Sequence, residues 1–77
     1  MIEIYGKNNC NYCKKAQQYL DIRNIEYTYK ELDKDFTREV MLDKFPTAKT
    51  YPQVKINNQT IGTYDQMVAY IENMGYE

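Results

Sequence analysis

Residues 1–20 read MIEIYGKNNCNYCKKAQQYL, and this stretch decides the fold. The apolar residues of 2–5 predict a short strand, and Gly6 ends it. Apolar residues then recur at helical spacing along residues 11–23, which predicts an amphipathic helix. The buried stripe of this helix is expected to consist of Cys13, Ala16 and Leu20. A strand that leads through a short loop into a helix is the first half of a β-α-β unit.

The rest of the chain supplies the remaining elements. They are a strand over residues 25–32, a helix that starts at Asp35 or Thr37 and stops at Pro46, a hairpin of residues 53–56 and 59–61, and a last helix opened by residues 63–66. The expected apolar positions are Phe36, Val40, Met41 and Phe45 in the second helix and Met67, Val68, Ile71 and Met74 in the last. In the last helix, Thr63 and Gln66 have the spacing of a capping box.

The element order is therefore β-α-β-α-β-β-α within one domain over residues 1–77. The first β-α-β unit requires a right-handed crossover between parallel strands, whereas the terminal hairpin is antiparallel. We expect an α/β fold with a four-stranded mixed sheet, covered by helices on both faces because both faces of a small sheet need cover.

Composition excludes several classes of function. Lys and Arg number 10 against 11 Asp and Glu, so the net charge of −1 does not favour binding to nucleic acid. Histidine is absent, which excludes histidine-based acid–base catalysis and histidine metal ligands. No apolar run approaches the ~18–20 residues of a membrane span, and residues 1–5 lack the pattern of a signal peptide. We expect a cytoplasmic protein that does not bind membranes, and nothing predicts an oligomer, so we expect a monomer.

The two cysteines, Cys10 and Cys13, carry the strongest chemical signal. At i and i+3 on a first helical turn their side chains share one face, close enough for a disulfide. Cys10 lies at the helix N-terminus, where unpaired N–H groups and the helix dipole stabilise a thiolate. Nearby basic residues add to this field; they are Lys7, Lys14 and Lys15. The position predicts Cys10 as the nucleophile and Cys13 as the resolving thiol.

A cysteine pair can also serve in metal binding or in structure. A structural zinc site needs about four ligands, and two cysteines without histidine cannot supply them within one chain. A metal or cluster that bridges two subunits, or two unrelated buried cysteines, would also account for the residues. A Cys-x-x-Cys pair in a cytosolic β-α-β context most favours a redox dithiol.

Three motifs resemble those of glutaredoxins, and the resemblance extends over the whole chain. They are Lys7-x-x-Cys10-x-Tyr12-Cys13, Thr50-Tyr51-Pro52 and Gly62-Thr63-Tyr64-Asp65. The chain is most similar to the short redoxins encoded by bacteriophages. The resemblance implies a thioredoxin fold and a thiol–disulfide oxidoreductase that reduces protein or glutathione mixed disulfides. It also implies glutathione as the reductant, ribonucleotide reductase as a partner, and no bound cofactor.

The resemblance also implies roles for individual residues. Tyr51–Pro52 is expected to be a cis peptide facing the cysteines, with the Tyr51 backbone free to pair with a substrate; a plain alternative makes Pro52 the first residue of an edge strand. Lys7 would meet a substrate carboxylate, unless it is only a solvated charge. Tyr12 would flank the reactive sulfur, unless it is a core aromatic.

The start of the last helix is a second expected binding element. The N–H groups of Tyr64 and Asp65 would bind a carboxylate of glutathione, and the Asp65 carboxylate would meet its ammonium group. Alternatively, Asp65 only stabilises the first turn of the helix.

The sequence departs from the glutaredoxin pattern at three positions. Asn11 replaces the usual proline between the cysteines, Thr63 replaces the second glycine of a Gly-Gly pair, and Gln66 replaces a frequent aspartate. The last two concern glutathione specificity and leave open a redoxin reduced by thioredoxin reductase. Two further alternatives are a glutathione-dependent iron–sulfur cluster carrier and a non-catalytic module that captures extended peptides.

Overall fold

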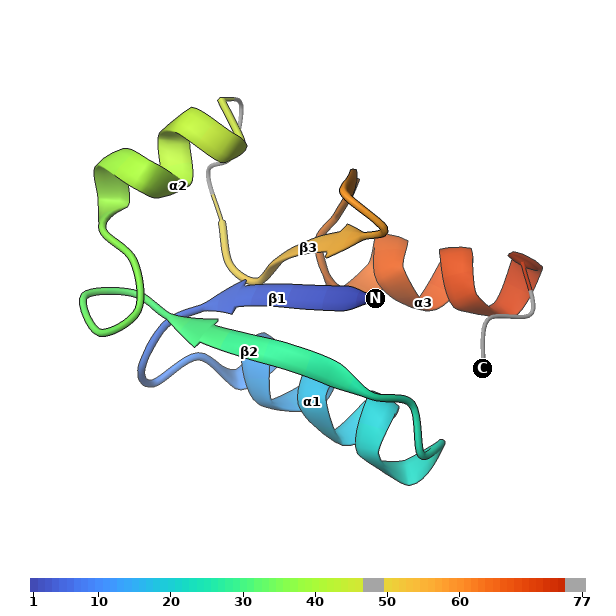
Figure 1. Cartoon of the computed structure of the whole chain (residues 1–77). Helices are drawn as coiled ribbons and strands as arrows, with labels where there is room; N and C mark the ends of the chain where they lie inside the picture. The colour runs from blue at the N-terminus through green and yellow to red at the C-terminus, as the bar shows by residue number, and fades with distance from the viewer. Residues whose placement is uncertain (47–49, 75–77) are drawn as a thin grey trace.

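The computed structural model describes residues 1–46 and 50–74, and its elements follow the predicted order (Figure 1). They are β1 (Ile2–Gly6), α1 (Asn11–Ile22), β2 (Tyr27–Glu31), α2 (Arg38–Lys44), β3 (Gln53–Ile56), β4 (Gln59–Gly62) and α3 (Tyr64–Met74). The strands form one sheet in the order β2-β1-β3-β4. β1 pairs with β2 in parallel and with β3 antiparallel, and β3 pairs antiparallel with β4. The mixed four-stranded sheet and the thioredoxin fold are confirmed.

The sheet separates two hydrophobic clusters. The larger one joins the strands to α1 and α3, and it contains Ile2, Ile4, Ala16, Tyr19, Leu20, Ile25, Val54, Ile56, Met67 and Ile71. The smaller one lies under α2 and contains Tyr5, Phe36, Met41 and Phe45. Figure 1 shows α2 on one side of the sheet and α1 on the other, so helices are present on both faces as expected.

Cover of the α2 face is less complete than expected. Beyond Tyr5, the β1 residue on this face is Glu3, which is paired with Lys55 across the sheet and lies 3.6 Å from Lys30 Nζ. The two lysines also lie over aromatic rings, Lys30 over Tyr5 at 5.3 Å and Lys55 over Phe45 at 5.6 Å. A seven-residue helix is too short to cover four strands, and the part of this face beside it carries charged side chains.

Helix ends agree with the local signals, with small corrections. Thr37 rather than Asp35 caps α2, because its Oγ1 accepts a hydrogen bond from the Val40 N–H at 3.3 Å. The predicted strand over residues 25–32 is shorter, since the Ile25 N–H returns to the Leu20 carbonyl at the end of α1, at 3.0 Å.

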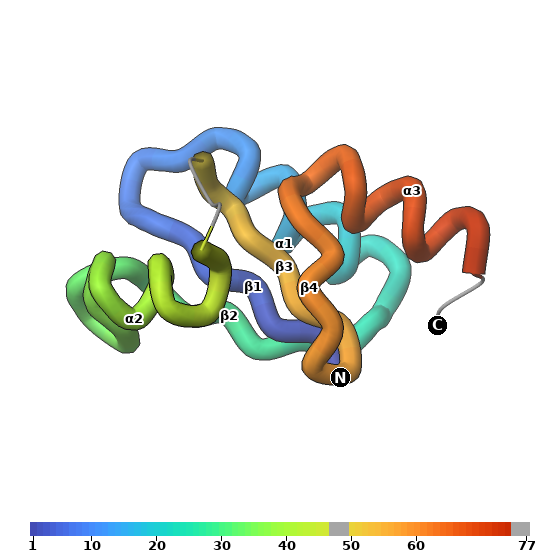
Figure 2. The backbone as a smooth tube through the Cα atoms, turned by 90° about the horizontal axis from the view of Figure 1, so that it is seen from above, coloured from blue at the N-terminus to red at the C-terminus, as the bar shows by residue number. Residues whose placement is uncertain are grey.

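Two expected core positions are wrong. Val40 and Met74 are exposed, because the short α2 turns only Met41 towards the sheet and α3 extends beyond the core after Ile71. The hairpin turn lies beside the N-terminus (Figure 2), where the Asn57 N–H donates to the Met1 carbonyl at 2.8 Å. No helix within residues 1–46 and 50–74 has both the length and the apolar character to cross a membrane.

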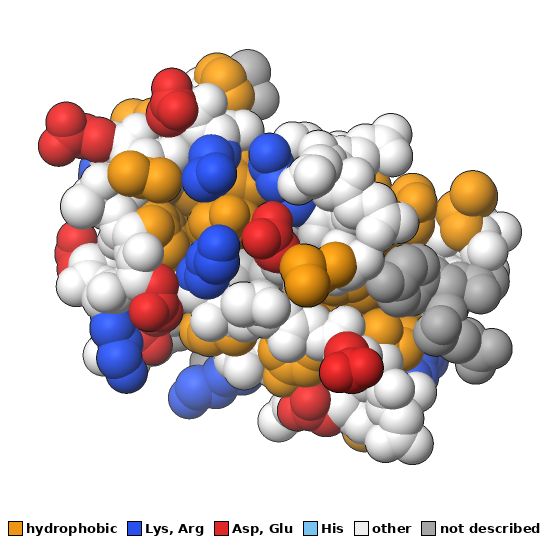
Figure 3. All heavy atoms as spheres, in the orientation of Figure 1, with side chains coloured by type: hydrophobic (Ala, Val, Ile, Leu, Met, Phe, Trp, Pro, Cys, Tyr) orange, Lys and Arg blue, Asp and Glu red, His pale blue; other side chains and the backbone are white. Residues whose placement is uncertain are grey.

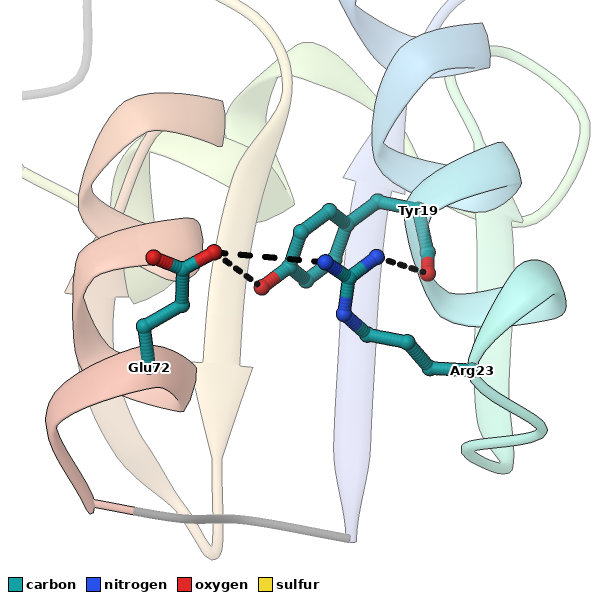
Figure 4. A network of polar contacts seen from close by, with 3 residues as sticks. All are labelled: Tyr19, Arg23 and Glu72. Carbon is teal, nitrogen blue, oxygen red and sulfur yellow. Dashed lines mark hydrogen bonds and ion pairs between the residues drawn. The ribbon is translucent and has the colours of Figure 1, made fainter.

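A polar network ties α1 to α3 (Figure 4). The Tyr19 hydroxyl donates to Glu72 Oε2 at 3.2 Å, and the Arg23 guanidinium lies 3.7 Å from the centre of the Tyr19 ring. Arg23 also donates to the Tyr19 carbonyl at 3.4 Å and lies 3.9 Å from Glu72. Burial raises the pKa of Tyr19, opposed by Arg23 and assisted by Glu72, so its hydroxyl remains a donor at neutral pH.

The packing of α1 can be tested with two apolar residues of the same helix. Leu20 is fully buried in the larger cluster, whereas Ile22 is 77% exposed. Leu20→Ala should lower the free energy of unfolding by about 2–5 kcal/mol, because the buried side chain leaves a cavity. Ile22→Ala should change it by less than ~0.5 kcal/mol. Urea unfolding of the oxidised proteins measures both, and equal losses would contradict the assigned helix face.

Candidate active site

Cys10 occupies the N-cap of α1, as predicted. Its backbone is extended (φ −117°, ψ 110°), and its sulfur accepts a hydrogen bond from the Cys13 N–H at 3.2 Å. The two residues form a disulfide with their Cα atoms 5.2 Å apart. Cys10 retains 8% exposure against 1% for Cys13, so a reaction partner reaches Cys10 more easily. The amide bond and the helix dipole both favour negative charge on the Cys10 sulfur once the disulfide is reduced.

A groove of about 280 Å³ lies beside this first turn. Its lining brings together six residues expected at the site, Tyr12, Thr50, Tyr51, Pro52, Tyr64 and Asp65, and adds Thr63. Tyr12 is 54% exposed, with its ring 6.0 Å from that of Tyr64, so it is not a core aromatic. Lys15 Nζ lies 4.9 Å from the centre of the Tyr12 ring. The groove is therefore built by three segments: the start of α1, residues 50–52 and the start of α3.

The segment before β3 presents free backbone to this groove. The Tyr51–Pro52 peptide bond is cis, as expected. Pro52 is buried and leads into β3, which is paired on both sides, so Pro52 does not begin an edge strand. Neither the N–H nor the C=O of Tyr51 has a backbone partner among residues 1–46 and 50–74. An extended substrate segment can use these two groups.

Lys7 belongs to a second, adjoining groove. Its Nζ lies 5.4 Å from the centre of the Tyr51 ring, and residues 50–52 lie beside the loop between β1 and α1 (Figure 2). This groove has a volume of about 580 Å³ and is lined by Lys7, Leu32, Arg38, Met41, Leu42, Thr50 and Tyr51. Next to α2, Figure 3 shows basic, acidic and apolar side chains close together. Because the two grooves share Thr50 and Tyr51, one ligand can contact both.

Arg38 is a candidate binding residue that the sequence analysis missed. It is the first residue of α2, and it joins Lys7 only because residues 31–37 return the chain to the end of β1. The Leu32 N–H donates to the Gly6 carbonyl at 2.9 Å within that return. No motif or spacing in the sequence could have indicated this pairing of two basic side chains.

The start of α3 offers unpaired donors. The Thr63 N–H donates to Gln66 Oε1 at 2.8 Å, which is half of the predicted capping box. The N–H groups of Tyr64 and Asp65 have no acceptor within the described part of the chain. They lie at the positive end of an eleven-residue helix and line the smaller groove, so they can bind a carboxylate. The Gln66 amide oxygen is engaged with Thr63 and lies against Gly62, whose φ is 126°.

Comparison with known proteins places this geometry in a family. Residues 2–61 match the glutaredoxin family model. The chain belongs to the glutaredoxin family. Glutaredoxin-1 of Rhizophagus irregularis is 33% identical over 75 residues, which cover 94% of this chain and 74% of that protein.

Two solved structures show the same fold. Glutaredoxin 1 of Francisella tularensis, complexed with cacodylate, matches with a TM-score of 0.79 and 25% identity over 95% of this chain and 93% of its own. A buckwheat glutaredoxin–glutathione complex also has a TM-score of 0.79, at 22% identity over 95% of this chain and 69% of that one.

The protein is thus a glutaredoxin-type, glutathione-dependent disulfide oxidoreductase with Cys10 and Cys13 as its Cys-x-x-Cys pair. This assignment overturns the alternatives of two unrelated cysteines and of a non-catalytic peptide module.

The environment of Cys10 predicts a low thiol pKa in the reduced protein. With Cys13→Ser, which leaves the residue 13 N–H in place, Cys10 should alkylate at pH 6 at least about tenfold faster than the cysteine of a short peptide, whose pKa is ~8.5. With Cys10→Ser, the buried Cys13 should react slowly. Iodoacetamide labelling against pH measures both rates. A Cys10 rate equal to that of the peptide would contradict the thiolate assignment.

Proposed function

We propose that this glutaredoxin reduces glutathione mixed disulfides of proteins, with Cys10 as nucleophile and glutathione as the source of electrons. One observation carries the proposal. The N-cap sulfur of α1 lies beside a groove whose far wall is the start of α3, where the N–H groups of Tyr64 and Asp65 have no acceptor among residues 1–46 and 50–74. Such a groove suits a small anionic thiol compound held next to the reacting sulfur.

The proposed reaction consists of two exchanges. The Cys10 thiolate attacks the glutathione sulfur of a mixed disulfide, the S–S bond breaks, and the protein substrate leaves as a thiolate that takes up a proton. The new Cys10–glutathione disulfide is then attacked by a second glutathione thiolate, which releases oxidised glutathione and restores the Cys10 thiolate. In the dithiol route, the Cys13 thiolate attacks the Cys10 sulfur instead, the bond to glutathione breaks, glutathione leaves as a thiolate, and the Cys10–Cys13 disulfide present in this structure closes.

The groove residues match the chemical groups of glutathione, which carries two carboxylates and one ammonium. The Tyr64 and Asp65 amides would bind the γ-glutamyl carboxylate, and the Tyr51 backbone would pair with the cysteinyl residue. Lys7, with Arg38 in the same groove, would meet the glycine carboxylate. The buckwheat glutaredoxin of the same fold forms a complex with glutathione, which supports glutathione as the ligand.

The ammonium group has one carboxylate available in the groove, that of Asp65. Gln66 offers only a neutral oxygen, and that oxygen already accepts the Thr63 N–H. Hydrogen bonds to charged groups contribute ~1.5–3 kcal/mol against ~0.5–1.5 for neutral ones. We therefore propose that glutathione serves this protein with a weaker apparent affinity than it has in glutaredoxins with an aspartate at this position.

Substitutions at the start of α3 test the ammonium site. Gln66→Asp should lower the apparent KM for glutathione roughly threefold to tenfold, and Asp65→Asn should raise it by a similar factor, because each changes one charge-assisted bond. Gln66→Glu adds the same charge and can still accept the Thr63 N–H, so it separates charge from helix capping. Coupled assays with glutathione reductase measure these values.

The control for Asp65→Asn is Glu26→Gln, which removes an exposed negative charge away from both grooves. It should leave the KM unchanged. The ammonium site is contradicted by an unchanged KM in both Gln66→Asp and Asp65→Asn. Efficient reduction of the protein by thioredoxin reductase in that case would favour a redoxin of that type.

The proposed role also includes a compartment and a partner protein. We place the protein in the cytoplasm as a monomer of the short bacteriophage type that donates electrons to ribonucleotide reductase. The groove beside Cys10 suits an electron carrier that docks on a larger disulfide-bearing protein. Reduction of oxidised ribonucleotide reductase by the wild-type protein, and failure of Cys10→Ser in the same assay, is the expected outcome.

A further inference from the structure

Two walls of the smaller groove belong to different helices, α1 and α3, and the Tyr64 side chain links them. Tyr12 is on the first turn of α1, and Tyr64 is the first residue of α3. The Tyr64 ring lies between two tyrosines of α1, 6.0 Å from Tyr12 and 6.4 Å from Tyr19, the latter in a perpendicular arrangement. Tyr12 is 54% exposed whereas Tyr19 is buried, so Tyr19 is the buried support behind Tyr64.

Tyr19 is itself held on three sides (Figure 4). Its hydroxyl donates to Glu72, the Arg23 guanidinium covers its ring at 3.7 Å, and it is packed into the larger cluster. The direct Arg23–Glu72 pair is 3.9 Å long between side chains that are 43% and 60% exposed. Such an exposed pair contributes little by itself, so the contacts that pass through Tyr19 are the main link.

This arrangement gives Tyr19 two contact points on α3. The ring contacts Tyr64 at the start of the helix, and the hydroxyl binds Glu72 eight residues later, roughly 12 Å along the helix axis. Together with the burial of Met67 and Ile71 in the larger cluster, these two contacts hold α3 against α1. The start of α3, with the free N–H groups of Tyr64 and Asp65, is thereby fixed relative to the start of α1 and Cys10.

We propose that Tyr19 is a positioning residue for glutathione: it holds Tyr64 and the first turn of α3 at the distance from Cys10 that the ligand requires. This inference rests on the proposed placement of glutathione in the groove. Loss of the Tyr19 ring loosens the α3 wall and weakens glutathione binding. The Cys10 thiolate keeps its reactivity, because its own bond to the Cys13 N–H lies within α1.

Two substitutions separate the parts of this role. Tyr19→Phe removes the bond to Glu72 and keeps the ring against Tyr64, whereas Tyr19→Leu removes both. We expect Tyr19→Leu to raise the apparent KM for glutathione roughly threefold to tenfold, and Tyr19→Phe to raise it by about twofold. In both variants kcat at saturating glutathione and the iodoacetamide rate of Cys10 should stay within about twofold of wild type.

Tyr27 provides the matched control. Its hydroxyl also donates to a carboxylate, Asp21 Oδ1 at 3.0 Å, but Tyr27 is on β2 and lines neither groove. Tyr27→Phe and Tyr27→Leu should leave the KM unchanged even where they lower stability. If the Tyr27 variants raise the KM as much as the Tyr19 variants, the effect is general destabilisation and the positioning role is refuted. Should Tyr19→Leu fail to fold, the comparison of Tyr19→Phe with Tyr27→Phe decides.

A double-mutant cycle with Tyr64 completes the test. If Tyr19 acts through Tyr64, Tyr19→Leu should add little to the KM increase already caused by Tyr64→Leu. Additive increases would overturn the proposed route. An unchanged KM in either Tyr64→Leu or Tyr19→Leu would overturn only the positioning role, because both variants keep the backbone N–H groups proposed to bind glutathione. An unchanged KM in both Asp65→Asn and Gln66→Asp would instead contradict the proposed glutathione site.

Discussion

The hydrogen bond from the Cys13 N–H to the Cys10 sulfur is the interaction on which the chemistry of this protein depends. It exists because the first N–H groups of a helix have no acceptor within the helix, and Cys10 occupies the N-cap that faces them. The same geometry brings the two sulfur atoms together and leaves Cys10 the more accessible. The burial of α1 against the sheet holds this turn in place.

A second helix start is used in the same way on the opposite wall of the groove. Within the described part of the chain, the N–H groups of Tyr64 and Asp65 at the start of α3 also have no acceptor, and both residues line the groove. A thiolate at one helix start and a carboxylate at the other would both be stabilised by helix dipoles. The site therefore suits an anionic thiol compound that bridges the two helix starts.

Residues 50–52 connect this groove to the basic one next to α2. Thr50 and Tyr51 line both, and the Tyr51 backbone, which has no backbone partner among the described residues, lies at their junction. A ligand can thus extend from the α3 start to Lys7 and Arg38 without leaving the surface of the protein. The continuity explains how a small domain of net charge −1 can present a positive site to an anionic partner.

Local sequence determined the elements, the N-cap position of Cys10, and the residues of the smaller groove apart from Thr63. These features depend on spacings of three or four residues, on caps, and on motifs that each lie within one segment. Only the tertiary structure decided which segments meet. Arg38 lines the same groove as Lys7, the Tyr19 ring contacts Tyr64, and part of the α2 face is polar. All three features depend on helix lengths and rotations, which are determined by packing. The expectation that Val40 and Met74 lie in the core was wrong for the same reason. Periodicity identifies an apolar stripe, but the extent of the opposing sheet decides how much of that stripe is buried.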